Sequence, residues 1–161
     1  MLTISFKKVS PTHHNFRIET SVGGKETYEL ETKTYLFHDL VHFAVESEAH
    51  LTNSFYGLLN QGNHYNDLSD NDPMETVMAG NKEALMTERV VGIMSGVLKQ
   101  DATSKQALTG LTNLLSASGE AIPLWFTEEY IARVKEHMRK LEGEWKGTLF
   151  GSTMTLTFSL D

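Results

Sequence analysis

The chain begins with three stretches in which apolar and polar residues alternate. The apolar members are Leu2, Ile4 and Phe6 in the first stretch, Phe16 and Ile18 in the second, and Tyr28 and Leu30 in the third. A fourth stretch near the end alternates Met154, Leu156, Phe158 and Leu160 with threonine and serine. Successive side chains of a strand point to opposite faces, so this period of two predicts four strands, each with one buried face.

Turn-forming residues separate the first three stretches, namely Ser-Pro-Thr at residues 10–12 and the pair Gly23-Gly24. For Ile18 to face the same way as Tyr28, an odd number of residues must separate the two. We therefore expect a three-residue loop at residues 22–24, which places Ile18 opposite Tyr28, rather than a two-residue turn.

Between the third and fourth alternating stretches, apolar residues recur every three or four positions, which is typical of helices. The expected helices cover residues 36–48, a short segment from the N-cap Asn53 to Gly62, residues 82–100, a segment from Thr103 or Ser104 to just before Gly119, and a segment from the cap Thr127 to Trp145. Residues 63–73 are mostly polar and predict a mobile loop.

Three strands, a run of helices and a final strand indicate an α+β fold. We expect an antiparallel sheet of about four strands, three N-terminal and one C-terminal, with about four to five helices mainly on one face. A chain of 161 residues is long enough for a full core and predicts a single domain over residues 1–161.

Composition argues against several classes of function. The net charge of -7 disfavours a nonspecific binder of nucleic acid or of acidic membranes. The absence of cysteine excludes disulfides, thiol catalysis and cysteine-bound clusters. No segment reaches the roughly 20 apolar residues of a membrane helix and the N-terminus has no signal-peptide core, so we expect a cytoplasmic protein. Without a phosphate-binding glycine motif or a nucleophile elbow, no nucleotide cofactor is predicted.

Candidate chemistry is concentrated on the helix expected at residues 36–48. With His38 placed at zero on a helical wheel, His42 falls at about 40°, Glu46 at about 80° and Asp39 at about 100°. The apolar residues of this helix fill the remaining arc. The helix is therefore two-sided, with two imidazoles and two carboxylates on its polar side.

Two histidines four residues apart on a helix lie above one another and can bind one metal ion. His38 and His42 have this spacing, and Glu46 is a candidate for the third ligand or for the carboxylate that orients a ring. The pattern His-Asp-x-x-His also resembles the His-Glu-x-x-His of zinc proteases, although Asp39 is one methylene shorter than glutamate. The sequence therefore predicts a zinc or manganese site, with Asp39 and Glu46 as candidate catalytic groups for a hydrolytic reaction.

The nearest candidates for a further metal ligand are His50 and His64, which flank the short helix after residue 53. A loop histidine with no ligand role is the alternative for each of them.

Other interpretations of the polar face stay open. It can be a solvated surface of a non-enzymatic interaction or accessory protein, or a metal-free acid–base or small-molecule site. A buried structural histidine is disfavoured, because the histidines lie opposite the apolar face. A homo-oligomer is a further prediction, through the helix face with Gly92 and Gly96, four residues apart, or through the apolar stripe that ends at Trp145.

The chain also resembles a family of small uncharacterised bacterial proteins. The resemblance rests on the run His38-Asp39-Leu40-x-His42-Phe43-x-Val45-Glu46, on Phe55-Tyr56-Gly57-Leu58-Leu59-x-x-Gly62, and on Trp145 followed by Gly151 and an alternating strand. Its strong part covers residues 37–62. Family members often have proline before the first histidine, where this chain has Phe37. The resemblance implies a shared fold and a shared site region, and it brings no assigned activity.

Overall fold

The computed structural model describes residues 1–22, 24–68 and 80–160. Its sheet contains the strands β1 (Leu2–Lys8), β2 (His13–Thr20), β3 (Lys25–Glu31) and β4 (Thr153–Phe158). The strand order is β3-β2-β1-β4, and each neighbouring pair is antiparallel. The predicted α+β fold, with three N-terminal strands and one C-terminal strand in a single sheet, is confirmed.

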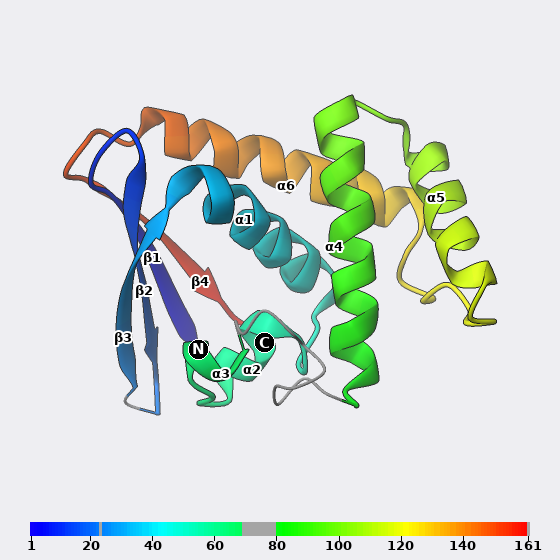
Figure 1. Ribbon diagram of the computed structural model, residues 1–161, viewed down its shortest axis with the longest axis horizontal. Coiled ribbons are helices and arrows are strands. Elements are labelled where there is room, and N and C mark those ends of the chain that lie inside the picture. Colours follow the sequence, from blue (N-terminus) through cyan, green and yellow to red (C-terminus); the bar gives the residue numbers. More distant parts are fainter. Residues whose placement is uncertain (23, 69–79, 161) are drawn as a thin grey trace.

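One face of this sheet is apolar, as the period of two predicts. The buried side chains of the strands include Leu2, Ile4, Phe6, Phe16, Ile18, Met154, Leu156 and Phe158. The threonines between them in β4 are exposed. All helices of the described residues lie on the apolar side of the sheet (Figure 1). The sheet therefore buries one face only, and the core lies between that face and the helices.

The pairing of β2 with β3 differs from the predicted register. Ile18 lies opposite Glu26, and Phe16 rather than Ile18 lies opposite Tyr28. The hairpin closes through a hydrogen bond from the Thr20 N–H to the Gly24 carbonyl, so its loop starts one residue earlier than expected. The predicted odd separation holds, because a shift by two residues keeps every side chain on its face.

The helices are α1 (Thr32–Ala49), α2 (Phe55–Asn60), α3 (Tyr65–Leu68), α4 (Lys82–Gln100), α5 (Ser104–Ser116) and α6 (Glu128–Gly147). The Thr127 hydroxyl accepts a hydrogen bond from the Tyr130 N–H and caps α6, as predicted. Thr103 caps α5 in a capping box with Gln106, which confirms the expected start of that helix.

Two segments differ from the prediction near the candidate site. The short helix α2 has Ser54 rather than Asn53 at its N-cap. The predicted polar loop at residues 63–73 contains the one-turn helix α3, whose Tyr65 is buried against Tyr28 and Phe16 at ring-centroid distances of 4.6 and 5.3 Å. The segment packs on the core because burial of the Tyr65 ring is favourable. The rest of that predicted loop, residues 69–73, lies outside the described residues.

Helix α1 occupies the middle of the helical layer. It contacts β3, α2, α4 and α6, while α5 packs outside them against α4 and α6 (Figure 1). Buried tyrosines fix its position: Tyr56 of α2 donates a hydrogen bond to the Asp39 carbonyl, and Tyr130 of α6 donates one to the Val45 carbonyl. Helix α1 therefore has other elements packed around it, and its polar side is largely shielded from solvent.

No helix of the described residues combines the length and apolar character needed to cross a membrane. A Cβ added at Gly92 or Gly96 would meet no atom within 4 Å, and the two glycines line a shallow pocket with Gln106 and Gly110 of α5. Contact with a second copy through this face stays a prediction.

Candidate metal centre

The polar side of α1 is covered by α2 and α4 rather than open to solvent. His42 is 2% exposed, Asp39 5% exposed and Glu46 fully buried. Only the side chain of His38, at 53% exposure, faces water. The alternative of a solvated polar face is therefore wrong for Asp39, His42 and Glu46. The expectation that no histidine of this helix is buried is wrong for His42. The physical reason is that α2, which also contacts β1, and α4 both pack against α1.

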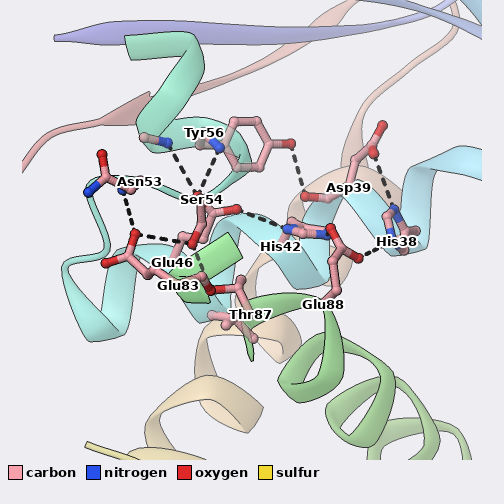
Figure 2. Close-up of polar contacts among 12 residues, drawn as sticks. His38, Asp39, His42, Glu46, Asn53, Ser54, Tyr56, Glu83, Thr87 and Glu88 are labelled. Atoms are coloured by element: carbon pink, nitrogen blue, oxygen red, sulfur yellow. Dashed lines mark hydrogen bonds and ion pairs between the residues drawn. The ribbon is translucent and has the colours of Figure 1, made fainter. Parts of the chain in front are cut away.

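His42 lies at the centre of this buried polar layer, and both nitrogens of its ring have partners. Its Nδ1 is 2.9 Å from Oε2 of Glu46, one turn further along α1. Its Nε2 is 3.0 Å from Oε1 of Glu88, which comes from α4. The two carboxylates thus hold the ring from opposite sides (Figure 2).

Glu46 connects this ring to the start of α2. Its Oε1 accepts hydrogen bonds from the backbone N–H groups of Tyr56 at 2.8 Å and Gly57 at 3.3 Å. Since Oε2 accepts from His42, the carboxylate is engaged on both oxygens. Glu46 is therefore occupied on the far side of the His42 ring, and it does not lie beside Nε2 as a third metal ligand would.

His38 forms a similar but looser arrangement at the surface. Its Nδ1 lies 3.6 Å from Oδ1 of Asp39, and its Nε2 lies 4.0 Å from Oε2 of Glu88. The rings of His38 and His42 are 4.7 Å apart, nearly perpendicular. The second oxygen of Asp39, Oδ2, is buried without a hydrogen-bond partner among the described residues. Both histidines thus turn Nδ1 toward a carboxylate and Nε2 toward Glu88.

One nitrogen from His38, one nitrogen from His42 and one oxygen from Glu88 all lie within 4.8 Å of one another. Two imidazoles and a carboxylate are a donor set that zinc and manganese accept. Glu88 was not among the ligands predicted from the sequence, because it lies on α4, far along the chain from His38 and His42. In the sequence, Glu88 is marked only by its position as a charged residue close to the apolar residues Val90 and Val91.

A second polar cluster holds α4 against the start of α2, next to Glu88. The hydroxyls of Ser54 and Thr87 are 2.6 Å apart, and both residues are buried. The Glu83 carboxylate accepts a hydrogen bond from the Asn53 N–H. Because Thr87 and Glu88 are neighbours in α4, the bond between Ser54 and Thr87 helps to set the position of Glu88 (Figure 2).

The histidines predicted as further ligands lie elsewhere. His50 is the left-handed C-cap of α1, with φ of 53°, and is exposed. The side chain of His64 is 74% exposed, and its Nδ1 lies 3.6 Å from Oε1 of Glu26. Neither belongs to the group formed by His38, His42 and Glu88.

Charges in the layer shift several protonation equilibria. Burial lowers the pKa of His42, but hydrogen bonds to Glu46 and Glu88 and the charges of both outweigh it and raise the pKa to about 10. Burial raises the pKa of Glu46 and that of Asp39 above their ordinary values. The pKa of Glu88 is lowered, because its bond to His42 and the charge on that ring outweigh its burial. In the metal-free protein these shifts favour a protonated His42 beside the Glu88 carboxylate at neutral pH.

The raised pKa of His42 predicts how stability depends on pH in the presence of a chelator. The unfolded chain releases the ring proton near the ordinary value of 6.5, and the folded protein releases it near 10. The stabilisation from this ring is complete below pH 6.5 and is lost as pH rises through about 10. The free energy of unfolding should therefore fall over this range, by at most about 1.4 kcal/mol per pH unit. Urea unfolding at several pH values measures the slope, and a His42→Gln variant should lack most of it. Equal slopes in both proteins would show that His42 stays neutral.

Comparisons of this chain with models of protein families, with curated proteins and with solved structures find no match.

Proposed function

We propose that this protein binds a divalent metal ion, zinc or manganese, through His38, His42 and Glu88, and that the ion activates water for hydrolysis of a small molecule. The observation that carries the proposal is the common orientation of the two rings. Each Nδ1 faces a carboxylate, Asp39 or Glu46, and each Nε2 faces Glu88.

Metal-binding histidines usually donate their other ring N–H to a carboxylate or carbonyl, which leaves the metal-facing nitrogen with its lone pair. Glu46 provides this partner for His42 at 2.9 Å, and Asp39 is placed to provide it for His38. A merely solvated pair of histidines has no need of two inward carboxylates, one of them fully buried. In the metal-free protein a proton occupies Nε2 of His42, so a metal ion would replace that proton.

The number of ligands favours a reactive site over a structural one. Structural zinc sites take four protein ligands, whereas catalytic sites take three and leave a position for water. Among the described residues the group contains three candidate ligands, two of which reach solvent: His38, and Glu88 at 35% exposure. A metal ion held there would lower the pKa of a bound water toward about 7.

A second candidate function has one observation in its favour. The ion pair of His42 with Glu46 and Glu88 is complete without any metal, with both ring nitrogens bonded. On this alternative the polar layer only joins α1, α2 and α4 in a non-enzymatic interaction protein.

Metal titration separates the two functions. Calorimetry with zinc and with manganese, on protein purified without a His tag, should show one saturable site in the wild type. A His38→Ala, His42→Ala double variant should lose that site, while a His50→Ala, His64→Ala double variant should keep it. Equal weak binding by all three proteins, or none by any, would contradict the proposal and favour the structural alternative. If the site binds metal, ester and phosphoester hydrolysis with and without the ion tests the reaction class.

A further inference from the structure

Trp145 and Gly151, which the metal centre does not involve, converge on Lys8 at the end of β1. The Lys8 ammonium donates a hydrogen bond to the Trp145 carbonyl at 2.7 Å and lies 4.5 Å from the centre of the Trp145 ring. The Gly151 N–H donates to the Lys8 carbonyl at 2.7 Å, in a turn where Gly151 has φ of 86°. That backbone conformation favours glycine. Gly151 therefore holds the backbone of Lys8, and Trp145 holds its side chain.

A cavity of about 150 Å³ lies beside this lysine. It is lined by Lys8, Ser10, Pro11, Thr32, Trp145 and Phe150. The Phe150 ring is 62% exposed, and its centre is 5.9 Å from the Lys8 ammonium. Two aromatic rings and an ammonium group therefore border one small opening between the turn after β1, the start of α1 and the turn before β4.

The charge of Lys8 is not balanced within the described protein. Lys8 is partly buried, and it forms no ion pair with any carboxylate of the described residues. Its one hydrogen bond goes to a carbonyl, which leaves two of the three ammonium donors for another partner. An ammonium group with free donors beside a cavity is the kind of group that binds a carboxylate or phosphate through charge-assisted hydrogen bonds.

Thr32 adds a second donor to the cavity. Its hydroxyl oxygen lies 2.9 Å from Nδ1 of His14, a fully buried residue whose Nε2 has no partner among the described residues. An unsatisfied buried N–H is rarer than an unsatisfied acceptor, so the ring proton belongs on Nδ1, where it donates to Thr32. The hydroxyl proton of Thr32 is then free to donate into the cavity.

The surrounding backbone also favours a negative group. Thr32 is the first residue of α1, an 18-residue helix with no acidic residue in its first turn. The positive end of the helix dipole thus adds to the field of Lys8. Two acidic residues neighbour the lining in the sequence, Glu31 before Thr32 and Glu144 before Trp145; both are exposed, and Glu31 accepts a hydrogen bond from the Thr34 hydroxyl.

We infer that this cavity binds the carboxylate or phosphate group of a small ligand whose flat apolar part lies against Trp145 and Phe150. The volume sets the size, because sites that enclose a drug-sized ligand measure about 300–1,000 Å³ and this one holds only a head group. The aromatic walls provide the apolar contact. The site is independent of the metal centre and does not rest on the proposed hydrolytic function.

Trp145 provides the readout for a binding experiment. A Trp125→Phe background removes the other tryptophan, which packs on Tyr130 and Phe126 away from Lys8. Titration with inorganic phosphate and, separately, with benzoate at constant ionic strength should give a saturable change in fluorescence. Tighter binding of benzoate would identify an aromatic carboxylate as the ligand class, and tighter binding of phosphate a phosphate group.

Variants of Lys8 decide whether the site is built for an anion. Lys8→Met should weaken binding by about tenfold or more, since it removes a charge-assisted donor. Lys8→Arg should retain most of the affinity, and Lys7→Met, at the exposed neighbouring position, should leave it unchanged. If Lys8→Met fails to fold by circular dichroism, Thr32→Val, which removes the hydroxyl donor, should weaken binding several-fold. A signal that does not saturate, or equal affinities of wild type and these variants, would overturn the inference.

Discussion

A Gly57→Ala variant is expected to lose at least about 3 kcal/mol of unfolding free energy, the upper end of the usual cost of overpacking. A Cβ at this position would lie within 2.9 Å of three backbone atoms, the carbonyl carbon and oxygen of Thr52 and the carbonyl oxygen of Leu51. Backbone atoms cannot turn aside as a flexible side chain can. Helix α2 would have to move away, and the hydrogen bond from the Gly57 N–H to Glu46 would be strained with it.

Urea unfolding of the wild type and the variant measures this loss. Gly143→Ala is a matched control, because Gly143 lies in α6 and a Cβ there would meet nothing within 4 Å. That control should gain about 0.5–1 kcal/mol, the usual advantage of alanine over glycine within a helix. A loss below about 1 kcal/mol for Gly57→Ala would mean that α2 can move away from the backbone of Leu51 and Thr52 at little cost. The short distance between these backbones would then not explain why residue 57 is glycine.

The sheet was predictable because its signal is local. Each strand carries its own period of two, and Met154, Leu156 and Phe158 are buried as that period requires. The helix caps Thr103 and Thr127 act within three residues of their own positions, so they too could be identified from sequence. The register of β2 and β3 was less certain, because shifts by two residues preserve the facing pattern and only the loop closure selects among them.

The polar layer was not predictable for a different reason. A helical wheel shows which residues share a face, but not what packs on that face. His38 and His42 were correctly placed together, with ring centres 4.7 Å apart. Glu88 reaches them from α4, and no spacing within either helix relates it to His42. The burial of Glu46 likewise depends on α2, whose N–H groups replace water around the carboxylate.

The residues of the strong part of the sequence resemblance, residues 37–62, include one connected set of contacts around α1 and α2. Asp39 contacts His38 through their side chains and accepts the Tyr56 hydroxyl through its carbonyl. His42 bonds Glu46, and Glu46 bonds the backbone of Tyr56 and Gly57. Helices α1 and α2 therefore depend on each other, because the buried carboxylate of Glu46 needs the N–H groups at the start of α2 as hydrogen-bond donors.

Glu46→Gln tests whether this connection serves metal binding, and we expect it to weaken zinc affinity by about 10–100-fold, the usual cost of losing the partner that orients a metal-binding histidine. Glutamine has nearly the same shape, and its carbonyl oxygen can still accept from the N–H groups of Tyr56 and Gly57. Its NH₂ group then faces Nδ1 of His42 and donates to it. Nδ1 then accepts a hydrogen bond, so the neutral ring carries its one proton on Nε2, where the metal requires a lone pair.

The same titration on Glu83→Gln provides the control. Glu83 belongs to the neighbouring polar cluster, where it accepts from the Asn53 N–H without contacting His42 in the described structure. Its substitution should change zinc affinity by less than about twofold, because the protonation of the His42 ring is unaffected. Thermal unfolding of both variants separates a loss of folding from a loss of binding. If folded Glu46→Gln protein binds zinc as tightly as the wild type, Glu46 serves only to hold α2, and the two inward carboxylates no longer support a metal centre.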